Sequence, residues 1–166
     1  MENKALLRLG PIRPEDMDAV AALLCCDEVK QTYMVPELTQ EEAQKLARRF
    51  SDLSREESRY VRGIYLEDTL IGFLNDTEIT EKSMELGWVV HPAYRNRGYA
   101  TCAVAVAVRE LFDKGFEEVF AGAFSENSAS IRVMEKVGMA LLDKKEVIAY
   151  RGKEHECVFY SICKIK

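Results

Sequence analysis

Residues 84–114 join three patterns in a fixed order: an alternating strand, a basic turn and a long apolar helix. Apolar residues alternate from Met84 to Val90, which predicts a half-buried strand. Pro92 follows this strand, and an alanine- and valine-rich run predicts a helix over residues 99–114 that Gly115 stops. A further strand is expected directly afterwards, at residues 118–123. A strand, a helix and a strand in succession form a crossover between parallel strands, so the chain is predicted to build an α/β sheet.

Further elements are predicted on both sides of this crossover. Strand patterns occur at residues 6–12, 60–66, 70–74, 141–150 and 155–164. Helices are predicted from Pro14 to about residue 24, from the Thr39 cap through residue 53, and over 125–137 with Ser125 or Asn127 as cap and Gly138 as stop. Residues 27–38 are predicted to be a loop. The expected fold is a mixed α/β sheet, mostly antiparallel, with about seven strands and about four helices.

Length and composition set the class of protein. The 166 residues fit a single domain spanning 1–166, and 48% apolar with 31% charged residues is typical of a globular protein. The longest uncharged apolar run, 100–108, is far shorter than the roughly 20 residues that cross a bilayer. Residues 1–10 lack the apolar region of a secretory signal. We therefore expect a cytoplasmic protein with no membrane partner.

Charge and cysteine usage exclude two further classes. A formal net charge of −5 disfavours a nucleic-acid-binding surface, which is usually basic. Five cysteines form no C-x-x-C pair, and the two histidines, His91 and His155, lie far apart. This pattern predicts neither a disulfide framework nor a metal site.

The turn between the central strand and its helix suits a phosphate. The first N–H groups of a helix have no acceptor within it, and the helix dipole is positive there. Gly98 lets a ligand approach the main chain, Ala100 keeps the first turn narrow, and Arg95 and Arg97 add positive charge. The alternative is a purely steric turn with solvated arginines, because glycine is common in turns. The motif is neither a Walker loop nor a dinucleotide fingerprint.

The pattern Arg95-x-x-Gly98-x-Ala100 resembles the acyl-CoA pyrophosphate loop of the GNAT N-acetyltransferase superfamily. In its surroundings, residues 85–101 resemble the RimJ/RimL-type branch of ribosomal-protein N-terminal acetyltransferases. Residues 127–139 are similar to the second signature of that branch, and residues 9–16 to its usual opening. Three signatures in the right order are far more specific than the loop alone.

The resemblance implies an acyl-CoA N-acyltransferase fold, in which two parallel strands splay into a V and acyl-CoA lies in the wedge. It implies that main-chain groups of Val89, Val90 and His91 face the pantetheine and thioester, and that the Asn127 side chain bonds the pantetheine arm. Pyrophosphate would be held by the main-chain amides of Arg95, Asn96, Arg97, Gly98, Tyr99, Ala100 and Thr101. The cosubstrate implied is acetyl-CoA, without a metal.

Three side chains are candidates for proton transfer. Glu85 occupies a position where GNAT enzymes often carry a base, and Glu78 is a weaker candidate; the alternative for Glu85 is a solvent-facing strand residue. Many GNAT enzymes protonate the leaving thiolate with a tyrosine, but the matching residue here is Met134. Ser130, one turn earlier, is the substitute candidate, its alternative being a helix-surface serine.

The function predicted from these features is transfer of an acetyl group from acetyl-CoA to a primary amine. A protein N-terminal amine, a small amine such as a polyamine or amino acid, and an antibiotic all stay open as acceptors. The alternatives are an acyl-CoA-binding sensor without transfer activity, which Met134 permits, and a structural domain with an empty wedge. Many GNAT relatives form homodimers, which is the assembly the resemblance suggests.

Overall fold

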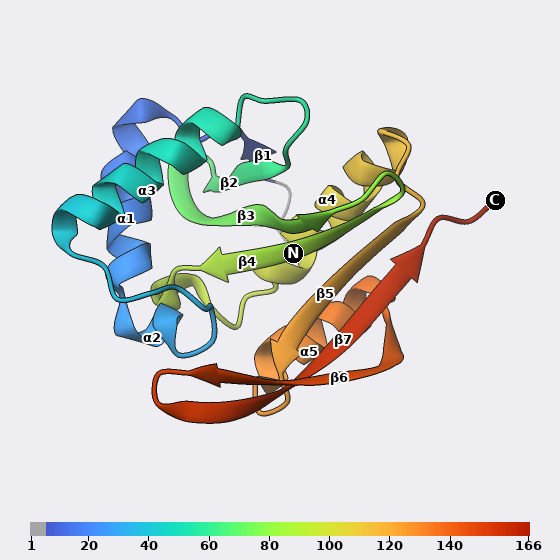
Figure 1. Ribbon diagram of the computed structural model, residues 1–166. Coiled ribbons are helices and arrows are strands. Elements are labelled where there is room, and N and C mark those ends of the chain that lie inside the picture. Colours follow the sequence, from blue (N-terminus) through green and yellow to red (C-terminus); the bar gives the residue numbers. More distant parts are fainter. Residues whose placement is uncertain (1–5) are drawn as a thin grey trace.

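A computed structural model describes residues 6–166 and contains one seven-stranded sheet in the order β1-β2-β3-β4-β5-β7-β6 (Figure 1). The strands are β1 (Leu7–Gly10), β2 (Val61–Leu66), β3 (Thr69–Ile79), β4 (Ser83–Val90), β5 (Glu118–Phe124), β6 (Ala140–Tyr150) and β7 (Lys153–Cys163). Only β4 and β5 pair in parallel; all other neighbours are antiparallel. The mixed, mostly antiparallel sheet is therefore confirmed. The expectation on secretion rests largely on residues 1–5, which lie outside the described part.

Five α-helices accompany the sheet in residues 6–166, where about four were expected. They are α1 (Met17–Cys25), α2 (Asp27–Lys30), α3 (Gln40–Leu53), α4 (Tyr99–Asp113) and α5 (Ser128–Val137), with short 3-10 turns η2 (Pro14–Asp16) and η3 (Pro92–Tyr94). The additional helix is α2, within the segment 27–38 that was predicted to be a loop. None of these helices is long and apolar enough to cross a membrane.

The helices cover both faces of the sheet, so the strands at its centre are apolar on both sides. One core lies between the sheet and α4, and contains Leu86 and Val104. The other lies between the sheet and the α1 and α3 helices, and contains Leu24, Phe73 and Val89. Successive residues of a strand point to opposite faces, which places Val89 and Leu86 in different cores. In Figure 1, α1, α2 and α3 gather at one side of the sheet and α4 and α5 lie behind it.

The parallel strands β4 and β5 separate after a short contact. Their pairing extends only from Ser83 to Glu85 on β4, opposite Glu118 to Phe120 on β5. Beyond this point β4 stays paired with β3 as far as Val90, while β5 stays paired with β7. The two halves of the sheet therefore open into the predicted V, and one side of the last residues of β4 has no strand partner.

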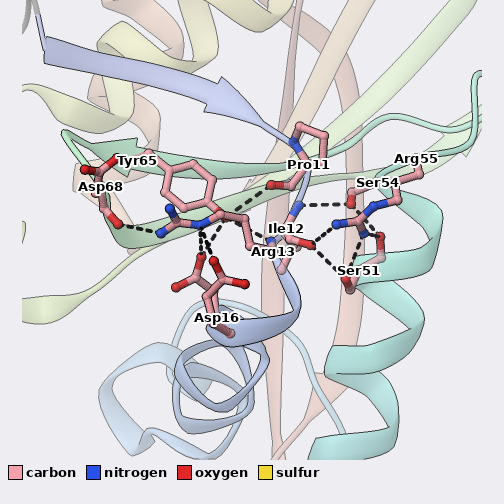
Figure 2. A network of polar contacts seen from close by, with 10 residues as sticks. Pro11, Ile12, Arg13, Asp16, Ser51, Ser54, Arg55, Tyr65 and Asp68 are labelled. Carbon is pink, nitrogen blue, oxygen red and sulfur yellow. Dashed lines mark hydrogen bonds and ion pairs between the residues drawn. The ribbon is translucent and has the colours of Figure 1, made fainter.

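A polar network fixes the N-terminal helices against the sheet (Figure 2). The Ile12 N–H donates to Ser54 Oγ at 3.0 Å, and the Ile12 carbonyl accepts from Ser51 Oγ at 2.7 Å and from Arg55 at 2.9 Å. On the other side, the buried Tyr65 hydroxyl is 3.0 Å from Asp16 Oδ2. Side chains thus satisfy the main chain where it leaves β1, as buried polar groups require. This attachment holds α1, which leads directly into α2.

Candidate functional site

A cavity of about 340 Å³ opens where β4 and β5 separate. This volume is within the range of small-molecule sites. Ten of the thirteen residues predicted for the site line it: Val89, Val90, Arg95, Asn96, Gly98, Tyr99, Ala100, Thr101, Asn127 and Ser130. His91, Arg97 and Glu85 lie outside its lining. No group of three or more His, Cys, Asp or Glu side chains in residues 6–166 is placed to hold a metal ion.

The loop before α4 presents a row of main-chain donors. Within residues 6–166, the N–H groups of residues 96–101 have no hydrogen-bond acceptor, and α4 begins without a side-chain cap. Gly98 precedes the helix with φ 81° and Asn96 has φ 64°, so both are in the left-handed region. Consecutive free amides at a helix N-terminus bind anionic oxygens, since the helix dipole and the donors act together. The geometry fits a pyrophosphate at this place.

Three cations line the same cavity as this row of amides. Arg95 comes from the loop, and Arg132 and Lys136 come from successive turns of α5; all three line the cavity. Arg97 instead lies over the ring of Tyr94, with its guanidinium carbon 5.8 Å from the ring centroid. Sequence reasoning missed the two α5 cations. The spacing of four residues between Arg132 and Lys136 could have revealed them, because it places both side chains on one face of a helix.

The main chain of β4 alternates between β3 and the cavity, and this corrects the expectation for His91. The His91 N–H donates to the Ile71 carbonyl at 2.7 Å, and its own carbonyl accepts from the Tyr94 N–H at 2.9 Å. Val89 faces the same way, since an added Cβ on Gly72 would lie 2.0 Å from the Val89 carbonyl oxygen. Val90 faces the cavity because strand residues alternate in their pairing direction. Of the three residues, Val90 therefore directs its main-chain groups toward the cavity; its carbonyl accepts from Arg95 Nε at 3.4 Å, which leaves its N–H for a ligand.

Asn127 and Ser130 form a hydrogen-bonded pair at the start of α5. Asn127 Oδ1 accepts from the Ser130 N–H at 3.2 Å, and Asn127 Nδ2 donates to Ser130 Oγ at 3.0 Å. Asn127 is thus the cap of the helix, whereas Ser125, the other predicted cap, has no such bond. Since Ser130 Oγ accepts this bond, its own O–H remains able to donate. Met134, where relatives have tyrosine, is fully buried in the core and does not reach the cavity.

Glu85 lies on β4 at the closed end of the splay. It pairs with Glu78 on β3, and Lys144 and Glu146 of β6 are near enough to affect its charge. Burial, and then the charge of Glu78, raise the pKa of the Glu85 carboxyl above its usual value. Glu85 shares a face with Gly87 and Val89, but it does not line the cavity. Any proton that it takes from a bound amine must therefore pass through water.

The opposite wall of the cavity comes from the segment around α2. Val29, Thr32 and Tyr33 line it, and none of them was singled out from the sequence. The Tyr33 ring meets Phe73 edge-on at 5.6 Å, and its hydroxyl is 3.0 Å from Asn75 Oδ1. Burial raises the pKa of the Tyr33 phenol, which stays protonated and donates to Asn75. This side of the cavity is formed mainly by Val29 and the Tyr33 ring.

Tyr99 introduces one unsatisfied polar group beside the cavity. The residue is 2% exposed, and its hydroxyl has no hydrogen-bond partner in residues 6–166. Most buried hydroxyls are paired, so this one reduces stability unless something else requires it. Its ring packs in the same core as Val104 and Leu86.

Comparison with known proteins agrees with this geometry. A family model described as "Acetyltransferase (GNAT) domain" matches residues 7–140. The chain belongs to the GNAT family. The predicted membership is thus confirmed by a match that spans most of the chain. This GNAT domain is also 38% identical over 79 residues to the uncharacterized N-acetyltransferase YnaD of Bacillus subtilis. That match spans 44% of this chain and only 44% of the relative.

Solved structures show the same fold over nearly the whole GNAT domain. A RimL ribosomal L7/L12 α-N-protein acetyltransferase in complex with coenzyme A superposes with a TM-score of 0.84 at 17% identity, covering 95% of this chain and 94% of that one. Spermidine N-acetyltransferase from Vibrio cholerae, in complex with CoA and spermine, superposes with a TM-score of 0.83 at 16% identity, covering 96% of each chain. At such identities the likeness establishes the fold, including the V-shaped splay.

Proposed function

We propose that this GNAT domain transfers an acetyl group from acetyl-CoA to a primary amine. The observation that carries the proposal is the row of free amides at residues 96–101, which lies beside a cavity in the splay between β4 and β5. Pyrophosphate is held by these amides, and Arg95, Arg132 and Lys136 supply the positive charge for the phosphates. The pantetheine chain pairs with the main chain of Val90. Both structural neighbours described above were solved with CoA.

The reaction needs a neutral amine, a polarised carbonyl and a proton for the departing thiolate. The amine nitrogen attacks the thioester carbon, a C–N bond forms, and the C–S bond breaks. The Val90 N–H faces the cavity and stabilises the negative charge that develops on the carbonyl oxygen. Glu85 takes the amine proton through water, and its raised pKa brings it nearer to the working pH. The Ser130 hydroxyl donates to the thiolate, which is a good leaving group in any case.

The acceptor is proposed only as a class. Protein N-terminal amines and polyamines are both represented among the structural neighbours. We propose that the reaction takes place in the cytoplasm. The family resemblance suggests a homodimer.

Release of CoA thiol from acetyl-CoA tests the proposal. Purified protein is assayed with spermidine, with a peptide that has a free N-terminal serine, and with the same peptide acetylated at its N-terminus and lacking lysine as the matched control. Thiol release with either amine and none with the blocked peptide supports transfer to a primary amine. CoA binding without release in any reaction favours the sensor function instead. Absence of CoA binding overturns both.

A further inference from the structure

The tip of the β6–β7 hairpin is fastened to the α2 segment across the open side of the splay. The Tyr150 hydroxyl, at the end of β6, donates to the Lys30 carbonyl at 2.6 Å. The same oxygen is 3.3 Å from the Tyr33 carbonyl and 3.4 Å from the Val35 N–H. Arg151 follows at the turn and lies 2.6 Å from Asp27 in an ion pair. Figure 1 shows this hairpin reaching from the far half of the sheet toward α2.

The α2 segment depends on this attachment. A helix of four residues, Asp27–Lys30, has too few internal hydrogen bonds to be stable by itself. Its last carbonyls have no partner within the helix, and Tyr150 satisfies the carbonyl of Lys30. The exposed Arg151–Asp27 ion pair adds little, since both side chains are more than a third exposed. Tyr150 is therefore the principal contact between the hairpin and this segment.

Tyr150 also reaches Tyr33, whose carbonyl lies 3.3 Å from the Tyr150 hydroxyl, while Phe73 and Asn75 of β3 contact the Tyr33 side chain. Tyr33 forms the wall of the cavity on the side away from α5, and an added Cβ on Gly87 of β4 would lie 3.6 Å from the Tyr33 ring. The free amides lie at the start of α4, and Arg132 and Lys136 come from α5. Arg95 pairs with Glu28 of α2 at 4.0 Å, but both side chains are exposed, so this ion pair contributes little. A molecule that reaches the end of β4 from the α2 side must therefore pass Tyr33. The phosphate-binding residues have no contact with Tyr150 among the hydrogen bonds of residues 6–166.

We propose that Tyr150 is a positioning residue for the acceptor: its hydroxyl holds Tyr33 in place and thereby sets the affinity for the amine, while acetyl-CoA binding is independent of it. This inference rests on the proposed acetyltransferase function. It predicts a separation between the two substrates. Loss of the Tyr150 hydroxyl weakens acceptor binding by about three- to tenfold, the range that one lost hydrogen bond supports. The KM for acetyl-CoA stays the same.

Tyr150→Phe tests this proposal, because it removes the hydroxyl and keeps the ring on Phe124 and His155, 5.9 and 6.2 Å away between centroids. Tyr160→Phe is the matched control on β7, since the Tyr160 hydroxyl makes no hydrogen bond within residues 6–166. Acceptor KM, acetyl-CoA KM and kcat are measured with spermidine and with the serine peptide. Hydrogen exchange of the amides at residues 30–33 is measured on the same proteins without substrate.

The expected result is faster exchange at residues 30–33 and a higher acceptor KM in Tyr150→Phe, with kcat and acetyl-CoA KM within twofold of the wild type and no change in Tyr160→Phe. Equal exchange in both variants overturns the attachment itself. Faster exchange with an unchanged acceptor KM, or with both KM values raised alike, overturns the acceptor role. A wild-type protein that acetylates neither amine overturns the proposed function and the acceptor role together, and the exchange data still decide whether Tyr150 holds the segment.

Discussion

Alanine substitutions of Gly98 and Gly115, at the two ends of α4, distinguish a glycine needed for ligand binding from one needed only for its backbone angle. Gly98 before the helix has φ 81°, and Gly115 after it has φ 106°. Both positions strain any residue with a Cβ. An added Cβ on Gly115 meets nothing within 4 Å, so Gly115→Ala reports the backbone strain alone. Gly98→Ala adds the same kind of strain and also places a methyl group next to the free amides of residues 96–101.

The expected magnitudes follow from these positions. A left-handed alanine costs about 1–2 kcal/mol, so both variants should lose about that much free energy of unfolding. A hydrogen bond from an amide to a charged oxygen contributes about 1.5–3 kcal/mol. Losing one such bond to the pyrophosphate raises the Kd for CoA about tenfold or more in Gly98→Ala. Gly115→Ala should keep the wild-type Kd, because Gly115 lies at the opposite end of the helix.

Trp88 provides the assay. It is the single tryptophan of the chain, and it lines the cavity, so its fluorescence reports ligand binding without turnover. CoA and pantetheine, which lacks the pyrophosphate, are titrated into the wild type and both variants, and unfolding is followed in denaturant. Gly98→Ala should bind CoA more weakly than the wild type and bind pantetheine with the wild-type affinity. Equal CoA affinity in the two variants, or an equal loss for pantetheine, would refute the assignment of the loop to phosphate.

Three other substitutions give distinct results. Glu85→Gln should lower kcat by about a hundredfold or more near pH 7, and the difference in kcat from the wild type should become smaller as pH rises toward the amine pKa. A wild-type pH profile would rule out Glu85 as the base. The pKa of Glu85 is higher in the folded protein than in the unfolded chain. Ionisation of Glu85 therefore lowers the free energy of unfolding as pH rises between these two pKa values. Glu85→Gln removes this cost and should unfold at a higher denaturant concentration than the wild type at neutral pH. Gly72→Ala should lose about 1–3 kcal/mol of unfolding free energy, because its Cβ would lie 2.0 Å from the Val89 carbonyl oxygen. Gly87→Ala is the control, since the nearest atom to its Cβ would be 3.4 Å away. Equal denaturation midpoints of the two variants would contradict the clash at Gly72. Tyr99→Phe should gain up to about 1 kcal/mol of unfolding free energy and keep the wild-type affinity for CoA. Weaker CoA binding would show that the Tyr99 hydroxyl contacts the ligand.

Elements with local signals could be predicted from the sequence. The Thr39 cap is present, with the Glu42 N–H 3.1 Å from Thr39 Oγ1 and the Thr39 N–H 2.9 Å from Glu42 Oε2. Gly138 ends α5 at φ 102°. These interactions join residues three or four apart or concern a single φ angle, so the residue types alone reveal them.

Elements that depend on distant side chains were missed. The strand predicted at residues 70–74 continues to Ile79 as β3, although Asn75 and Asp76 are typical of a turn. The strand continues because the buried Asp76 carboxylate accepts from Arg59 at 2.7 and 2.9 Å and from the Tyr60 N–H at 2.7 Å. Such pairing removes the cost of burying the charge, and its partner lies 17 residues away. The α2 helix was missed for the same reason, since its contact with Tyr150 spans 120 residues.

The same contrast explains why the sequence predicts a cosubstrate and leaves the acceptor open. A phosphate site made of main-chain N–H groups at a helix start needs only a short run of residues with one glycine, so it can be recognised in the sequence. The acceptor wall has no such motif. It consists of Tyr33, placed by Asn75 from β3 and by Tyr150 from β6, and each of these contacts joins segments far apart in the chain. Two GNAT chains can therefore share the loop at residues 95–100 and bind different amines, because substitutions at the far partners of Tyr33 change the wall without changing the loop.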